Sequence, residues 1–227
     1  MATGRVMRFG QAILGSSNTL IYTCPSSRTA ILRDLAVCNN DSGARTYSLH
    51  FVKTGESVAD ANAVVKTRSI ASKVTDAYRF NLPMVTGDKI YAVADVGALL
   101  SLQASGTEYE GTLAPFVPTR LVQAVCTGSS VTVYTAPTAG SGTRAIIKDL
   151  LICNLTGGTP TFTIDLVPSG GSVSSTTKWY NAYALTANQH LHLRVSAVLE
   201  AGDTIRILAS TTSAVAINIH GAEWTVS

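Results

Sequence analysis

The stretch that decides the fold is Ala30-Ile-Leu-Arg-Asp-Leu35, because it returns as Ala145-Ile-Ile-Lys-Asp-Leu150 at an offset of 145 − 30 = 115. The same offset relates two pairs of dipeptides, Cys38-Asn39 with Cys153-Asn154 and Gly87-Asp88 with Gly202-Asp203. Self-similarity at a constant spacing is the signature of a duplicated structural unit. The sequence therefore predicts two homologous domains in tandem.

Before these stretches the offset between the two copies is smaller. Gln11 aligns with Gln123, and Tyr22-Thr-Cys-Pro25 aligns with Tyr134-Thr-Ala-Pro137, at 123 − 11 = 112. The Gly/Ser-containing segment 139–142 of the second copy accounts for the change, and we interpret it as a widened hairpin loop.

The register of the repeat also predicts the domain boundaries. We expect an N-terminal arm over residues 1–10, a first repeat over 11–109, a linker over 110–119 and a second repeat over 120–227. The linker contains Pro115 and Pro118, which cannot donate to a strand ladder and hold the chain extended.

Each copy has the pattern of an all-β domain. In Tyr47-Ser-Leu-His-Phe51 and Phe162-Thr-Ile-Asp-Leu166, large apolar residues alternate with polar ones, as in a strand with one buried face. Clusters of turn residues separate such runs, and 59–64 is the one segment that suggests a short helical turn. The sequence predicts two antiparallel β-sandwiches, of Ig-like or jelly-roll topology, and does not separate these two.

Composition excludes several classes of protein. Charged residues make up 14% of the 227 residues, against about a quarter in average soluble domains. The net charge of +3 leaves no basic stripe for nucleic acid and no polybasic membrane anchor. Apolar runs are too short for a transmembrane helix, and no signal-peptide stretch follows the N-terminus. We expect a neutral, partly apolar surface and neither a nucleic-acid nor a membrane partner.

The four cysteines are interpreted as buried apolar residues. Cys38 and Cys153 are matched, whereas Cys24 aligns with an alanine and Cys126 with a leucine. Replacement by small apolar residues is typical of cysteine used for packing, so we expect reduced thiols and no disulfide framework.

The histidines show no complete metal site. His190 and His192 are two residues apart, which on a strand places both rings on one face and would supply half of a site. No third ligand stands at a recognisable spacing, so we interpret this as a polar, exposed strand face without metal. We expect His50 and His220 to face solvent.

Three pairs of acidic residues occupy matched positions: Asp34 with Asp149, Asp88 with Asp203, and Glu108 with Glu223. Asp88 and Asp203 each follow a turn glycine, where a short carboxylate caps its own backbone. Glu108 and Glu223 are expected to bind a backbone amide or an arginine. The members of each pair lie in different domains, and no GxSxG motif exists, so we expect no catalytic site and no cofactor.

Five motifs of the second copy carry a resemblance: Tyr-Thr-Ala-Pro at 134–137, Ile-Lys-Asp-Leu at 147–150, Cys153-Asn154, Leu-Val-Pro-Ser-Gly-Gly at 166–171 and Leu-Glu-Ala-Gly-Asp-Thr-Ile at 199–205. They resemble a β-sandwich repeat of tailed-bacteriophage structural proteins, and the first copy carries the same frame more loosely. The resemblance implies a non-enzymatic virion component, made in the host cytoplasm, of the capsid cement, neck or tail accessory type. Its partners would be capsid, portal, neck or tail proteins.

Two surfaces are candidates for binding. Low charge and positive mean hydropathy favour a homo-oligomer, trimer or hexamer, with Arg5 and Arg8 anchoring the N-terminal arm. The alternative function is a carbohydrate or host-surface binding module, in which Trp179, Tyr180 and Tyr183 form a stacking platform.

Overall fold

The computed structural model describes residues 3–110, 116–138 and 143–224. The chain divides into two compact units, Met1–Leu113 and Ala114–Ser227. Within the described ranges the helical elements are two single turns of 3-10 helix, η1 (Asp60–Asn62) and η2 (Ser175–Thr177). The first of these falls in the segment 59–64, where the sequence suggested a helical turn. No helix in the described part is long and apolar enough to cross a membrane.

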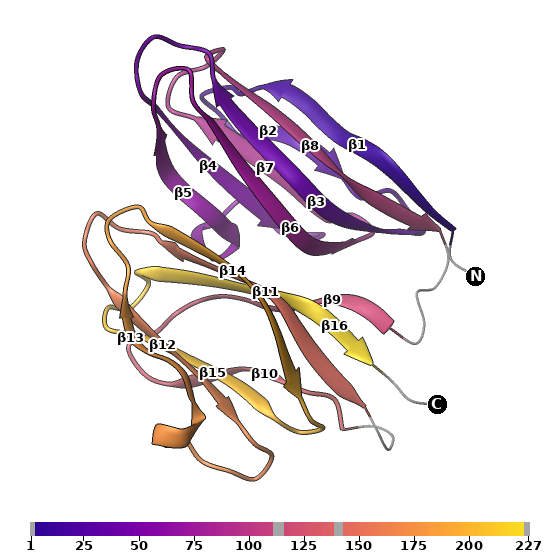
Figure 1. Cartoon of the computed structure of the whole chain (residues 1–227), viewed down its shortest axis with the longest axis vertical. Coiled ribbons are helices and arrows are strands. Elements are labelled where there is room, and N and C mark those ends of the chain that lie inside the picture. Colours follow the sequence, from indigo (N-terminus) through magenta and orange to yellow (C-terminus); the bar gives the residue numbers. More distant parts are fainter. Residues whose placement is uncertain (1–2, 111–115, 139–142, 225–227) are drawn as a thin grey trace. The chain divides into compact units, whose positions relative to one another are not determined.

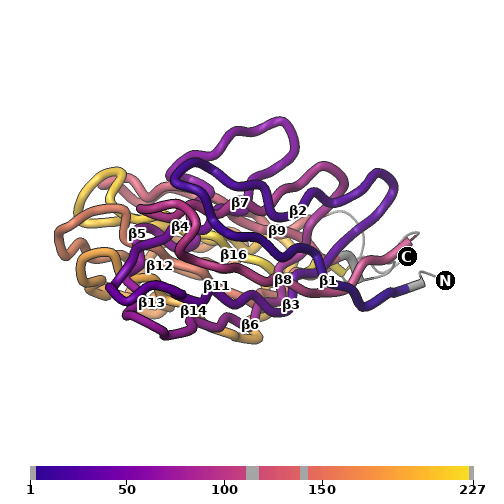
Figure 2. Tube along the Cα trace, turned by 90° about the horizontal axis from the view of Figure 1, so that it is seen from above, coloured from indigo at the N-terminus to yellow at the C-terminus, as the bar shows by residue number. Residues whose placement is uncertain are grey.

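The first unit contains eight strands in two antiparallel sheets (Figure 1). The strands are β1 (Thr3–Ile13), β2 (Thr19–Thr23), β3 (Arg28–Asn39), β4 (Arg45–Val52), β5 (Ala63–Ile70), β6 (Thr75–Val85), β7 (Lys89–Ala94) and β8 (Leu100–Glu110). One sheet has the order β1-β8-β3-β6 and the other β2-β7-β4-β5. In Figure 2 the tube shows β1, β8 and β3 side by side, as their pairing requires.

The second unit repeats this topology strand for strand. Its strands are β9 (Phe116–Val125), β10 (Val131–Thr135), β11 (Arg144–Asn154), β12 (Thr161–Val167), β13 (Lys178–Ala184), β14 (His190–Leu199), β15 (Thr204–Ala209) and β16 (Val215–Trp224). The sheet orders, β9-β16-β11-β14 and β10-β15-β12-β13, follow from those of the first unit when eight is added to each label. Eight antiparallel strands distributed over two sheets in this order form a jelly roll. The prediction of two tandem β-sandwiches is confirmed, and the topology is the jelly roll rather than the Ig-like one.

Alternation along the strands places the core of each unit between its two sheets. In the first unit Leu49 and Phe51 of β4 are buried, and in the second Phe162 and Ile164 of β12 are buried. Cys24, Cys126 and Cys153 are buried as expected, but Cys38 is only half-buried, since it lies on the opposite face of β3 from the core residue Val37. Within the described residues none of the four cysteines forms a disulfide.

The N-terminal segment differs from the expected arm. From Thr3 onward it forms the edge strand β1, paired with β8 as far as Ile13. The physical reason is Phe9, whose buried ring stacks on Tyr22 with 4.2 Å between centroids and so ties the segment to the sandwich. An arm over residues 1–10 is therefore wrong for the described residues 3–10.

The expected linker over 110–119 is also shorter than predicted at both ends. Glu110 still belongs to β8, and β9 begins at Phe116. Pro118 of β9 pairs with Ala222, and β9 is an edge strand, the position in a sheet where proline is tolerated. Pro115 and the loop 139–142 lie outside the described residues.

Candidate functional site on the outer sheet face

The matched aspartates after turn glycines hold loops together. The Asp88 carboxylate accepts the amides of Thr54 at 3.0 Å and Val85 at 3.2 Å. The Asp203 carboxylate accepts the two amides at the aligned positions, each at 2.9 Å. The interpretation of both residues as turn caps is confirmed, and the two carboxylates stabilise the backbone of these turns.

A second matched residue, whose bonds sequence reasoning missed, fixes another turn. The Asn39 side-chain amide donates to three carbonyls, the nearest being Gly43 O at 2.8 Å. Asn154 donates to the three aligned carbonyls, including Gly158 O at 2.8 Å. Each side-chain oxygen also accepts the amide two residues ahead. Both asparagines are fully buried, so they serve the fold.

The matched glutamates bond to tyrosine rather than to a backbone amide. Tyr22 Oη donates to Glu108 at 2.7 Å, and Tyr134 Oη donates to Glu223 at 3.0 Å. Burial raises the pKa of both tyrosines, and the adjacent carboxylate adds to that shift. Glu108 also pairs with Arg28 at 2.9 Å, as expected for one of the two. The alignment of the two tyrosines at the offset of 112 was the signal that would have found this bond, which links the two sheets.

The two histidines expected to face solvent are buried. His50 Nδ1 lies 3.1 Å from the side-chain oxygen of Asn62, which η1 brings over β4, and burial lowers the pKa of this imidazole. His220 is completely buried, and burial lowers its pKa well below 6.5, with Arg120 adding to that effect. The expectation of exposure was wrong for both, because strand alternation does not reveal what covers the outer face.

The strand β14 carries the histidine pair that suggested half of a metal site. His192 Nε2 lies 2.9 Å from Asp149 Oδ1, and both His190 and His192 are half-buried, which corrects the exposed face expected here. Among the described residues no group of three or more His, Cys, Asp or Glu is placed to hold a metal ion.

Asp149 belongs to a polar row that crosses all four strands of its sheet, and the first unit has the same row. The registers align Arg8, Ser105, Asp34 and Arg79 on β1, β8, β3 and β6, and they align Arg120, His220, Asp149 and Arg194 on β9, β16, β11 and β14. Each row lies at a β-bulge, a feature that re-aims side chains. Sequence reasoning matched only the aspartates of this row. Arg79 and Arg194 pair at the offset of 115, and Arg8 and Arg120 at the offset of 112, but spacing along the chain does not show that they share a row with the aspartates.

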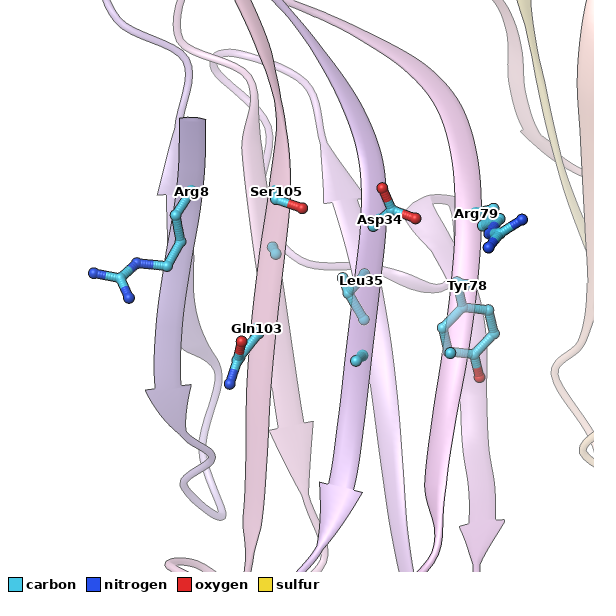
Figure 3. Close-up of a pocket in the computed structure, with 10 residues that line it drawn as sticks. Arg8, Asp34, Leu35, Tyr78, Arg79, Gln103 and Ser105 are labelled. Atoms are coloured by element: carbon cyan, nitrogen blue, oxygen red, sulfur yellow. The ribbon is translucent and has the colours of Figure 1, made fainter. Parts of the chain in front are cut away.

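The two rows differ in what stands beside the aspartate. The second unit has His220 in the row and His192 next to it, whereas the first has Ser105 and Ala77 at the aligned positions. In the first unit a pocket of about 400 Å³ lies over this row, and Arg8, Asp34, Ala77 and Arg79 of its lining are exposed. Figure 3 shows Arg8, Ser105, Asp34 and Arg79 on its four adjacent strands. This pocket is the candidate functional site of the described residues.

The aromatic residues of β13 pack around one core ring. Tyr180 and Tyr183 lie 5.6 Å and 5.5 Å from Phe162, measured between ring centroids. Trp179 and Tyr180 are half-buried against the core, whereas Tyr183 is 41% exposed. Part of this cluster therefore anchors β13, and Tyr183 presents its ring to solvent.

The arginines expected to anchor an arm both lie on β1. Arg5 is exposed, with its guanidinium 3.8 Å from Glu108. Arg8 is exposed as well and donates to Gln11 at 2.9 Å, as Arg120 does to Gln123. The structure brings Arg8, but not Arg5, into the polar row.

No protein-family model matches the sequence, and comparison with curated proteins finds no match. Among solved structures the chain is similar to the major capsid protein P2 of bacteriophage PM2, at 11% identity and a TM-score of 0.41 over 99% of this chain and 98% of that one. It is similar to the STIV MCP at 10% identity and a TM-score of 0.32, over 99% and 97%. It is also similar to a tandem CBM22 domain from Paenibacillus barcinonensis, at 9% identity and a TM-score of 0.24, over 99% and 91%. Likenesses at these TM-scores carry no functional argument, and the jelly-roll assignment rests on the strand order of the chain itself.

Proposed function

We propose that this chain is a non-enzymatic structural subunit of a virus particle, of the tailed-phage cement, neck or tail accessory type. The observation that carries the proposal is the duplication of one complete jelly roll, in which matched polar residues brace turns and sheets. Jelly rolls recur in capsid proteins, where they pack side by side. The sequence motifs at 134–137, 147–150 and 199–205 supply the likeness to tailed-phage proteins.

The exposed apolar side chains support a role in assembly. Val6 and Ile13 of β1 are 84% and 55% exposed, and Leu20 of the adjoining strand β2 is 50% exposed. In the second unit the aligned residues are Pro118, which is buried, Val125, which is half-buried, and the polar Thr132. Exposed apolar groups on a weakly charged protein mark interaction surfaces, and an open edge strand invites a neighbour.

The duplicated fold also suits a closed ring. Three copies of a chain with two equivalent jelly rolls present six similar units in pseudo-sixfold order, and six copies present twelve. We therefore propose a cyclic homo-oligomer, trimer or hexamer, that docks on capsid, portal, neck or tail proteins.

Light scattering of the purified chain, alone and with the major capsid and tail proteins of the same virus, tests this proposal. We expect a trimer or hexamer, or a particle-bound form, that Val6→Glu with Leu20→Glu weakens at least tenfold. Val74→Glu is the matched control, since Val74 is exposed at 44% and directly precedes β6, the strand at the opposite edge of the sheet from β1. A monomer under both conditions, with no binding to particles, contradicts the proposal.

A second candidate function is carbohydrate or host-surface binding. It is favoured by the aromatic residues of β13, because the first copy has Val64, Val65 and Arg68 at the aligned positions. Exposed aromatic rings are stacking platforms, and Tyr183 is such a ring. A glycan array tests it: saturable binding that Tyr183→Ala removes would favour this function, and no bound glycan would exclude it for the glycans tested.

A further inference from the structure

The segment 53–62, called the strap below, is bound to β4 by one buried cluster. The imidazole of His50 donates from Nδ1 to Asn62 Oδ1 at 3.1 Å and to Ala59 O at 3.3 Å. The Asn62 oxygen also accepts the amide of Ala59, and the Asn62 Nδ2 donates to Ser57 O, so His50 Nδ1 must carry the proton. His50 is 4% exposed and Asn62 1%. A buried imidazole therefore ties the strap to the strand.

The rest of the strap has few strong attachments. Its residues 54–57 and 59–60 are exposed. The Thr54 amide donates to Asp88 at 3.0 Å, and Asp60 forms a largely exposed ion pair with Lys66, of a kind that contributes little to stability. Segments with few buried apolar contacts open locally at a low cost in free energy. The state of His50 therefore has a large influence on whether the strap stays closed.

The surroundings of His50 disfavour its protonated form. Burial lowers the pKa of this imidazole and Lys66 of β5 adds to the shift, whereas the bond to Asn62 and the charge of Asp60 oppose it. From β7 the residue that faces His50 in the register is Tyr91. Once the strap opens and water reaches the imidazole, His50 binds a proton below pH 6.5 that it does not bind in the closed form. A fall in pH below 6.5 therefore favours the open strap.

The equivalent segment of the second unit, 168–177, is bound without a histidine. Asp165 aligns with His50, is 1% exposed, and accepts Thr177 Oγ1 at 2.9 Å and Lys178 Nζ at 3.1 Å. Histidine is the side chain whose charge ordinarily changes between pH 5 and 8. The two equivalent segments should therefore differ in their response to mild acid.

We propose that the strap is a pH-sensitive element of the first jelly roll, closed on His50 at neutral pH and released from β4 in mild acid, while the segment 168–177 stays closed. The release uncovers β4 at His50 without unfolding the two sheets. The inference goes beyond the proposed function, because it describes a conformational response of one jelly roll and does not depend on a role in a virion.

Amide hydrogen exchange of the full chain, followed by NMR at pH 7.5 and pH 5.5, tests the proposal. Protection factors, which exclude the intrinsic pH dependence of exchange, should fall at least threefold in acid for Ala59 and Asn62, whose amides bond within the strap. They should change by less than threefold for Ser174 and Thr177, the aligned residues of the second unit. A smaller fall in the strap, or a threefold fall at Ser174 and Thr177, would overturn the inference.

Three variants assign the response to His50. His50→Gln keeps a neutral donor for Asn62 and should reduce the fall in protection to less than threefold. His192→Gln, which removes a histidine of the second unit, is the matched control and should leave the fall unchanged. Lys66→Met leaves Asp60 to stabilise the imidazolium and should at least halve the fall. A fall that persists in His50→Gln, or disappears in His192→Gln, contradicts the proposal, and an undiminished fall in Lys66→Met does so even if His50→Gln fails to fold.

Discussion

The polar rows of the two jelly rolls begin and end alike, with arginine on both edge strands and aspartate on the third strand, yet they differ between these points. The first unit has Ser105 where the second has His220. By contrast, the buried bonds of Asn39 and Asn154 are the same in both units. The comparison teaches that the buried asparagines, whose loss would leave buried polar atoms unpaired, kept both identity and bonds, whereas the row on the outer sheet face changed at the position of Ser105 and His220.

The largest effect is expected from removing the buried asparagine that both units share. Asn154→Ala removes five hydrogen bonds around a buried turn and should lower the free energy of unfolding of the second unit by about 3 kcal/mol. Asn39→Ala should cost the first unit a similar amount. Both tryptophans of the chain lie in the second unit, so urea unfolding followed by fluorescence reports that unit and circular dichroism reports both.

The exposed neighbour Asn40 provides the control for this experiment. Asn40→Ala should cost less than about 0.5 kcal/mol, as surface substitutions usually do. Equal losses in Asn39→Ala and Asn40→Ala would mean that the buried turn contributes nothing specific.

The next effect is the pH dependence of the free energy of unfolding that the buried His220 causes. Because burial holds the pKa of His220 well below 6.5, the unfolded chain binds a proton below pH 6.5 that the folded chain does not. The free energy of unfolding should therefore be complete above pH 6.5 and fall below it, by about 1.4 kcal/mol per pH unit for this group.

Urea unfolding at several pH values between 5 and 8 measures this dependence. His220→Gln should flatten the slope seen by fluorescence, and His50→Gln, at the other buried histidine, should flatten the slope of the first unit. An unchanged slope in His220→Gln would show that this imidazole does not govern the acid sensitivity.

A smaller loss of stability is expected when either tyrosine–glutamate hydrogen bond is removed, and the loss should differ between the two units. Tyr22→Phe should cost about 1.5 kcal/mol, because it leaves one oxygen of the buried Glu108 without its donor. Tyr134→Phe should cost about half as much, since Glu223 is only half-buried and water can replace the hydroxyl. Thermal unfolding of both variants measures the difference, and a larger loss in Tyr134→Phe would contradict this reasoning.

The smallest effect is expected from separating the units. Residues 1–113 and 114–227, expressed separately, should each show β-type circular dichroism and melt cooperatively, because each unit has its own pair of sheets and core. If neither fragment folds while the whole chain does, the two units are not independent domains.

Much of the fold could be predicted from local pattern. Two-residue alternation in 47–51 and 162–166 indicated strands, and Gly87-Asp88 with Gly202-Asp203 indicated capped turns. The candidate pocket could not be predicted, because Arg8, Asp34 and Arg79 come from three strands whose neighbours are set only by sheet order.

The sequence by itself determined the duplication, the all-β class and the residues of the turns, since these depend on spacing along the chain and on local backbone preference. Only the tertiary structure decided the jelly-roll order, the place of residues 3–10 in an edge strand and the burial of His50 and His220. Those features depend on which distant strands pair and on what packs against each sheet face. The free energy of strand pairing comes from contacts between side chains on different strands, so no single segment determines it.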